Sequence, residues 1–351
     1  MHQVIGRLEN VGADLNAFTT KEETCVFASF LGEYYERALE LLSDILFNSI
    51  FPEKELEREK EVILDEISSY LDNPSESILD DFEEVLFPGH PLGNNVLGTI
   101  ETVQSLSRKH IFDFMAGNYL ADKIVLSSVG NIPFQKLCRL SVKYFGQHQP
   151  TSKTRNRIHP GEYTPQWNLV KEREVFQAHM VIGGLAYSHF DENRIPLAVL
   201  TNILGGPAMN SRLSMVLREK NGIAYNLESN YTPFSDTGIF TIYLGADEDK
   251  ISKALKLIDR ELKKVREQRL SPLQLHTARE QLKGQLAISV ESHQNEMLSM
   301  GKSMLVFNKV DTIAEIKHKI DQVTSSGLLE VANQVLDPKA LSMMIYKSAG
   351  E

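Results

Sequence analysis

Glu59 and Glu66 are the residues whose type and spacing most strongly indicate chemistry in this chain. They fall on an apolar stripe at helical spacing within Pro52–Leu71, two turns apart on one face. The stripe consists of Leu56, Val62, Ile63, Ile67 and Tyr70. A carboxylate on a core-facing stripe is costly unless it meets a cation, a metal ion or several hydrogen-bond donors. The pattern predicts either such a site or, as the plain alternative, two glutamates that bend out to water.

An internal repeat bears on this choice. Both copies have the order helix, glycine turn, strand, helix and long helix, expected at 3–10, 12, 24–31, 35–46 and 52–70 in copy one and at 211–220, 222, 238–245, 250–262 and 271–289 in copy two. In the long helix of copy two, Ala278 and Gln285 stand in place of the two glutamates. Because the same plan exists without acids there, the fold itself does not require them.

The repeat also predicts the fold class and the domains. Each copy alternates helices with hairpin-like and buried strands, which indicates an α+β fold with two homologous domains, each a mostly antiparallel sheet covered by helices. We expect a first domain at 1–148, with a buried strand at 123–129, then a linker at 149–165 and a second domain at 166–351. Copy two has Trp167–Asn210 before the point where copy one begins, so we expect the first domain to be truncated at its N-terminus.

Composition excludes several functions. Apolar content of 42% and charged content of 24% are ordinary for a water-soluble globular protein. A net charge of −10 disfavours a nucleic-acid partner, and no apolar run reaches the length of a membrane span. The chain has two cysteines, Cys25 and Cys138, expected to be buried thiols. With no leader before His2, these features predict a cytoplasmic protein, unless a leader has been lost.

The histidines do not complete a zinc site by sequence pattern. None of the ten forms H-x-x-E-H, H-E-x-x-H or a helical pair four residues apart. A catalytic zinc ion needs three protein ligands and one open position for a water molecule. One glutamate with a second one nearby does not meet that requirement.

Several motifs together resemble one family. They are Gly12-Ala13-Asp14-Leu15-Asn16-Ala17-Phe18 with the run to Thr24, Glu59 to Glu66, His90-Pro91-Leu92-Gly93, Leu204-Gly205-Gly206, Ser211-Arg212-Leu213 and Leu217-Arg218-Glu219-Lys220 with Gly222 and Tyr225. In this order they resemble the pitrilysin/insulinase family of inverted-zincin metallopeptidases, in the short bacterial branch similar to mitochondrial processing peptidase. The resemblance covers essentially the whole chain. Ala13 departs from the second glycine that is usual in the family.

The resemblance implies roles for named residues. Glu66 matches the family's zinc-ligand glutamate and Glu59 its second-shell acid, while the H-x-x-E-H motif with the remaining ligands would lie before Met1. Arg218 and Tyr225 match the pair that contacts the substrate carbonyl or the developing oxyanion. The plain alternative is that Arg218 complements a helix C-terminus and Tyr225 packs in a strand. Leu15, Asn16, Ala17 and Phe18 match the edge strand on which the family lays an extended peptide, although an ordinary strand edge would look the same.

Two functions remain open at this point. The first is a zinc-dependent metalloendopeptidase of peptides or unfolded segments, catalytically incomplete in this chain, for which zinc is the family cofactor but no bound zinc is expected here. The second is a non-catalytic peptide-binding or scaffold subunit that partners an active family member. In either case we expect the unpaired sheet edge and apolar surface of the first copy to pair with a second copy or with an active subunit.

Overall fold

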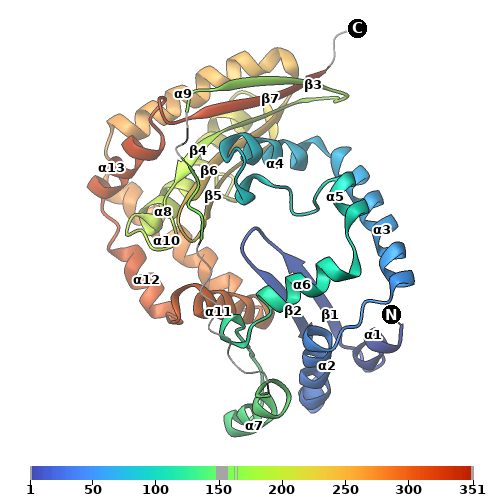
Figure 1. The fold of residues 1–351 in the computed structure, drawn as a ribbon. Helices are drawn as coiled ribbons and strands as arrows, with labels where there is room; N and C mark the ends of the chain where they lie inside the picture. Colours follow the sequence, from blue (N-terminus) through green and yellow to red (C-terminus); the bar gives the residue numbers. More distant parts are fainter. Residues whose placement is uncertain (1, 148–156, 162, 164, 349–351) are drawn as a thin grey trace. The chain divides into compact units, whose positions relative to one another are not determined.

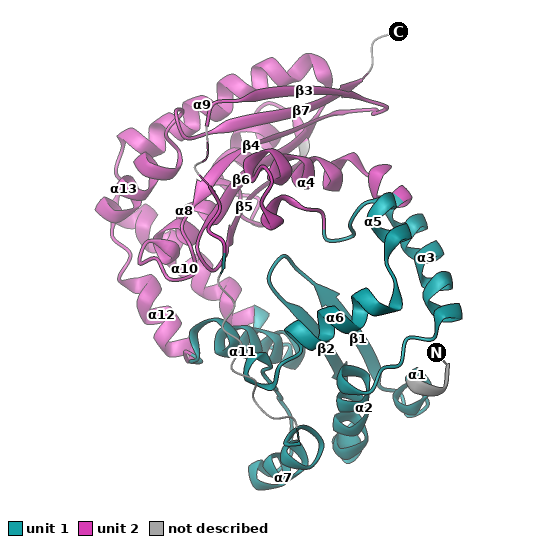
Figure 2. Cartoon of the chain, viewed as in Figure 1, with its two compact units in different colours: residues 1–67, 96–157, 289–310 teal, residues 68–95, 158–288, 311–351 magenta. Residues whose placement is uncertain are grey.

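The chain forms two compact units, each assembled from three segments. The computed structural model describes residues 2–147, 157–161, 163 and 165–348 (Figure 1). Unit 1 comprises residues 1–67, 96–157 and 289–310, and unit 2 comprises residues 68–95, 158–288 and 311–351 (Figure 2). The predicted domains, 1–148 and 166–351, follow the internal repeat and differ from these two units. The domain boundaries therefore stay a prediction. Most of the predicted linker, 149–165, lies outside the described residues.

The helices and strands follow the predicted order closely. The helices are α1 (His2–Glu9), α2 (Tyr35–Phe47), α3 (Glu53–Leu71), α4 (Pro74–Leu86), α5 (Ile100–Ser105), α6 (Arg108–Asn118), α7 (Phe134–Phe145), α8 (Arg194–Gly205), α9 (Ile251–Glu267), α10 (Pro272–Ser289), α11 (His293–Phe307), α12 (Ile313–Asp321) and α13 (Ser325–Val335), with a π-helical turn at Ser214–Glu219. The strands are β1 (Asp14–Thr19), β2 (Thr24–Ser29), β3 (Asn168–Arg173), β4 (Ala178–Ala186), β5 (Ala224–Pro233), β6 (Gly238–Ala246) and β7 (Ser342–Ser348).

Capping residues fix several helix starts. The side chains of Thr99, Ser107 and Thr312 each accept a hydrogen bond from the backbone N–H of the residue three positions later. The side chain of that later residue in turn accepts a hydrogen bond from the backbone N–H of the capping residue. These reciprocal bonds satisfy donors that the first helical turn leaves unpaired. The chain therefore enters α5, α6 and α12 at fixed residues.

Unit 2 is built on one mixed sheet with apolar residues on both faces. Its strand order is β3-β7-β4-β6-β5, antiparallel at every pair except β3–β7. Side chains alternate along each strand: Met180 and Phe240 pack with α8, α9 and α13, whereas Val181 and Tyr346 pack with Phe82 of α4. The sheet lies between two layers, and the mixed helix-and-sheet fold class is confirmed.

Asp81 of α4 fastens this helix to the sheet. Its Oδ2 accepts from Lys171 Nζ (2.5 Å) on β3 and from the Tyr346 hydroxyl (2.6 Å) on β7, and Arg173 lies 3.5 Å away. Burial alone would raise the pKa of Asp81, but the two hydrogen bonds and the charges of Lys171 and Arg173 outweigh it and hold that pKa below its ordinary value. The ionised carboxylate therefore links three elements of unit 2.

Unit 1 has a smaller core around a two-stranded antiparallel sheet, β1–β2. Leu8 of α1 packs with Ala38 and Leu41 of α2, and Leu140 of α7 packs with Leu39. The segment 289–310 joins this unit through α11, since Lys302 Nζ lies 2.8 Å from Glu23 Oε1 and Ser127 Oγ donates to the Met297 carbonyl (2.8 Å). Much apolar surface stays in water here because few elements cover one another.

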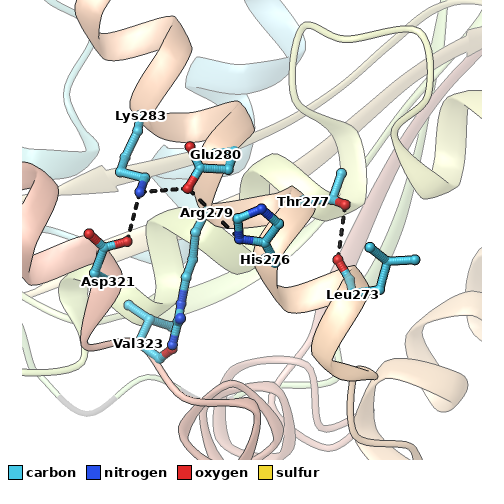
Figure 3. Close-up of polar contacts among 8 residues, drawn as sticks. All are labelled: Leu273, His276, Thr277, Arg279, Glu280, Lys283, Asp321 and Val323. Atoms are coloured by element: carbon cyan, nitrogen blue, oxygen red, sulfur yellow. Dashed lines mark hydrogen bonds and ion pairs between the residues drawn. The ribbon is translucent and has the colours of Figure 1, made fainter.

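The predicted repeat is visible in matching local contacts. Gly12 and Gly222 both adopt positive φ, +73° and +55°, at the turn into the hairpin of each half. Lys60 of α3 donates to the Gln104 carbonyl (3.2 Å), near the end of α5. Its repeat counterpart, Arg279 of α10, donates through Nε to the Val323 carbonyl (3.0 Å), just beyond α12 (Figure 3). In both halves a cation on the long helix binds the end of a following helix.

Each half also contributes a helix to the other half's unit. α4 follows the long helix α3 of the first half but belongs to unit 2, and α11 follows the long helix α10 of the second half but belongs to unit 1. Neither unit is therefore made from one half of the chain alone.

Two expectations about copy one are wrong. The segment 123–129 is not a strand. Within the described residues the sheet of unit 1 contains β1 and β2 alone, so the backbone of 123–129 does not pair with a strand. In the repeat it corresponds to β7, which pairs with β4. Cys138 is exposed rather than buried, while Cys25 is half-buried.

Across the described residues, we find no helix with both the length and the apolar character needed to cross a bilayer.

We predict that Asp81→Asn destabilises unit 2 by about 1–3 kcal/mol at pH 7, because the amide cannot replace a charge-assisted acceptor. Since the folded pKa of Asp81 lies below its unfolded value, this contribution is fully present above the unfolded pKa of about 3.9 and is lost as pH falls from there through the lower folded pKa. Urea unfolding at about pH 7, 4 and 3 should show the gap to wild type narrowing only below about pH 4. The control Asp113→Asn breaks an exposed ion pair with Lys109 and should change stability by less than about 1 kcal/mol. An equal loss in both variants would contradict the proposed anchor.

Candidate functional site

Of the two interpretations open for Glu59 and Glu66, the structure supports the plain alternative, in which both glutamates lie in water. Both side chains are exposed, and no hydrogen bond or ion pair joins either carboxylate to another described residue. The physical reason is that α3 buries only Ile67, and Val62, on the same stripe, is 49% exposed. The repeat counterpart Ala278 on α10 is buried, so the same helix position is covered in one half and open in the other. Burial therefore gives no argument for a metal at these residues.

α3 nevertheless holds both glutamates on one regular helix. The helix is continuous through both positions, which places them about 10 Å apart along its axis. Lys60, between them, is tied to Glu57 Oε1 (2.9 Å) and to the Gln104 carbonyl. In its last turn, Tyr70 donates a hydrogen bond to Asp80 of α4. These contacts fix the helix while leaving both acids in water.

The described residues do not fit a complete zinc site. Among them no group of three or more His, Cys, Asp and Glu side chains is placed to hold a metal ion. Glu66 could supply one oxygen ligand, and a zinc centre needs at least two more protein ligands. The assignment of Glu66 and Glu59 therefore depends on the family resemblance and stays a prediction.

β1 is an open strand edge, as the peptide-binding assignment requires. Among the described residues β1 pairs with β2 alone. Asn16, Ala17 and Phe18 are exposed and Leu15 is half-buried. The Ala17 N–H donates to Asn16 Oδ1 (2.8 Å), which indicates that this donor points to the open edge rather than into the ladder. Lys302 and the turn bonds at Thr20 hold the hairpin end in place.

Arg218 lies in a backbone irregularity. It belongs to the π-helical turn Ser214–Glu219, in which the Lys220 N–H bonds to the Met215 carbonyl, five residues back (3.1 Å). Such turns are rare in proteins overall, and those that occur often lie at functional sites. The Arg218 side chain is 45% exposed, and its Nε lies 3.7 Å from Glu219 Oε1, a weak contact that leaves the guanidinium available to a ligand.

Tyr225 lies at a second irregularity. The pairing of β5 with β6 passes from Ala224–Ala246 to Asn226–Gly245, so Tyr225 is an extra residue in a β-bulge. Bulges re-aim a side chain and concentrate near active sites. The Tyr225 side chain lies outside the described part of the structure, and its contacts stay a prediction.

Sequence reasoning missed both irregularities. The stretch from Ser211 to Lys220 was expected as an ordinary helix, and no residue in it signals a π-turn. The repeat offered one clue: Gly12 to Asp14 and Gly222 to Tyr225 occupy the same turn, yet the order of polar and apolar residues after it differs between the copies.

Two family models match the chain from residue 2 to residue 282. Residues 2–100 match the description Insulinase (Peptidase family M16), and residues 105–282 match Peptidase M16 inactive domain. The chain belongs to peptidase family M16. This confirms the resemblance to the pitrilysin/insulinase group.

Similar curated proteins carry related names. An uncharacterized zinc protease of Bacillus subtilis, YmxG, is 32% identical over 95% of this chain and 80% of its own length. An uncharacterized zinc protease of Rickettsia bellii is 29% identical over 98% of this chain and 82% of its own length. These names concern the relatives, and they support zinc as a cofactor of the group.

Solved structures share the M16 fold. The peptidase M16 inactive domain from Pseudomonas fluorescens aligns with a TM-score of 0.87 at 17% identity, over 99% of this chain and 83% of that one. A protease from Helicobacter pylori aligns with a TM-score of 0.87 at 18% identity, over 98% and 84% of the two chains. At these identities the likeness shows the fold alone.

Proposed function

We propose that these 351 residues form the peptide-binding framework of an M16-type zinc metalloendopeptidase and do not hydrolyse peptides by themselves. The observation that carries the proposal is the open edge of β1, which presents an outward backbone donor at Ala17. Peptides or unfolded segments are the substrate class, because pairing through the main chain recognises extended shape with little dependence on side chains.

Binding at β1 would proceed by strand addition. An incoming extended peptide would place its carbonyl oxygen on the Ala17 N–H, which first has to leave the Asn16 side chain. The neighbouring exposed Phe18, which contacts Phe27 with ring centroids 6.2 Å apart, offers an apolar surface to one peptide side chain. Hydrogen bonds to the peptide backbone would give the affinity. Contact with Phe18 would give a mild preference for an apolar side chain at one position of the peptide.

Arg218 and Tyr225 would supply a second set of contacts, to peptide carbonyl oxygens. A guanidinium keeps its charge at all working pH values, and a phenol donates one hydrogen bond, so both suit a carbonyl oxygen on which charge develops. The exposed, weakly paired state of Arg218 is what this role needs. The π-turn and the bulge support these two positions.

In the complete metallopeptidase that we propose, Glu66 would be a zinc ligand and Glu59 would lie in the second shell. Zinc would supply an activated water molecule for peptide hydrolysis. No hydrolytic step follows from the residues present, because the described acids do not fit a metal site by themselves.

We predict that Ala17→Pro lowers the affinity for a fluorescently labelled unstructured peptide by about tenfold or more, because proline removes the outward N–H and blocks the edge. Fluorescence anisotropy measures the binding. Ala17→Val keeps the donor and should bind like wild type, and circular dichroism should show both variants folded. Equal affinity of the proline variant and wild type would exclude β1 as the binding edge.

Arg218→Ala should weaken the same peptide by about fivefold to tenfold, the equivalent of about 1–1.4 kcal/mol for one lost donor contact. The matched control is Arg260→Ala, since Arg260 is also exposed and faces the adjacent Glu261 at 4.0 Å. The control should leave the affinity unchanged. If both variants weaken binding alike, the effect is general charge and not a contact of Arg218.

For the metal, we expect zinc well below one ion per chain by plasma emission after dialysis, and unchanged peptide affinity after chelator treatment, because Glu66 alone cannot form a closed coordination shell. Glu66→Gln should change neither value. One tightly bound zinc ion per chain, lost in Glu66→Gln, would show that these 351 residues hold the metal without an H-x-x-E-H pattern.

A further inference from the structure

The π-helical turn that carries Arg218 ends in successive carbonyl groups, 215 to 218, that accept hydrogen bonds from residues 220 to 223. Three of the donors are backbone N–H groups, those of Lys220 to Met215 (3.1 Å), Ile223 to Leu217 (2.8 Å) and Gly222 to Arg218 (3.0 Å). The donor to the remaining carbonyl, that of Val216, is a side chain: Asn221 Nδ2 lies 2.8 Å from it. Because backbone carbonyls inside a folded chain need a partner, Asn221 completes the hydrogen bonding of this turn.

The Val216 carbonyl distinguishes two forms of the turn. In an α-helix its donor would be the Lys220 N–H, four residues on. Here the Lys220 N–H reaches the Met215 carbonyl, five residues back, and the Asn221 amide bonds to Val216 instead. If the turn closed as an α-helix, the Asn221 amide would have to share its acceptor with Lys220. Asn221 therefore stabilises the π form relative to the α form.

The π form determines how Arg218 is presented. The hydrogen bonds on either side of it are ordinary, since the Met215 N–H bonds to the Ser211 carbonyl and the Gly222 N–H to the Arg218 carbonyl, each four residues back. Leu213 at one end and Ile223 at the other are buried in the core of unit 2. One helical residue corresponds to a rotation of about 100°. Loss of the extra residue would turn the two ends by about this angle relative to each other, and Arg218 lies between them.

We propose that Asn221 is a positioning residue for Arg218. Its side-chain amide holds the turn in the form that presents the guanidinium to a peptide, and Asn221 does not itself bind the peptide. This inference rests on the proposed function, in which Arg218 contacts a carbonyl oxygen of the bound peptide. Asparagine suits the role because its short side chain carries N–H donors that reach nearby backbone carbonyls.

Substitution of Asn221 tests the role through peptide affinity. Asn221→Ala should weaken binding of the labelled unstructured peptide by about threefold to fivefold, the factor that one neutral hydrogen bond is worth. Asn221→Leu, which keeps the size but lacks the donor, should have the same effect. The matched control is Asn118→Ala, because Asn118 Nδ2 likewise donates to a carbonyl at a helix end, that of Phe114 (2.7 Å), in unit 1. The control should bind like wild type.

A double-mutant cycle separates positioning from general destabilisation. In the Arg218→Ala background, Asn221→Ala should cause no further loss of affinity, because there is no guanidinium left to position. An equal loss in both backgrounds would overturn the proposal, and so would wild-type affinity of Asn221→Ala beside a weakened Arg218→Ala. If Arg218→Ala itself binds like wild type, the proposed carbonyl contact is absent and the positioning role falls with it.

Hydrogen–deuterium exchange tests the turn without any peptide. Amides of the segment 214–223 should exchange faster in Asn221→Ala than in wild type, since the α and π forms then compete more evenly. Arg218→Ala, which keeps the Asn221 bond, should exchange like wild type. Unchanged exchange in Asn221→Ala would show that the turn does not depend on this side chain and would overturn the proposal.

Discussion

The sheet of unit 2 is apolar on both faces, and this requires two covers. Helices α8, α9 and α13 cover one face, and α4, which comes from the first half of the chain, covers the other. Without α4, Val181, Tyr243 and Tyr346 would lie in water, and the Tyr346 hydroxyl would lose its acceptor, Asp81. Because α4 is held there, the end of α3 is held as well, through the hydrogen bond from Tyr70 to Asp80. The last turn of α3, from Ser68 on, thus belongs with the sheet of unit 2.

The two halves share one plan but bury it to different extents. Every residue of β6 is buried, while β2 at the same place in the repeat buries Phe27 alone. α13 buries four residues against α8, including Val331 at 0% exposure, whereas every residue of α6 is at least partly exposed and Phe114 reaches 54%. The open state of Glu59 and Glu66 follows from the same asymmetry. Acids on an apolar stripe are tolerated without a partner when nothing packs over the helix.

Local sequence signals predicted most elements, and tertiary pairing decided the failures. The expected helix at 35–46 agrees with α2, Tyr35–Phe47, to within one residue, and capping at Ser107 and Thr312 explains two further helix starts. The segment 123–129 has a strand-like composition, but a strand also needs a neighbour, which sequence cannot supply. The stripe on α3 predicted burial correctly only at Ile67, since periodicity shows which face is apolar and not whether anything covers it. The expectation that Cys138 is buried was wrong for the same reason, because no described residue covers that face of α7.

The repeat also separates residues that the fold needs from residues that function needs. The turn from α1 through Gly12 into β1 is regular, with a continuous register between β1 and β2. The corresponding turn of the second half contains a π-helical segment at Arg218 and a bulge at Tyr225. Such irregularities cost stability and persist where a side chain has to be placed in a particular way. Since the first half completes the same connection without them, folding does not require them, and the contact with a substrate carbonyl that we propose for Arg218 and Tyr225 would give them a physical reason.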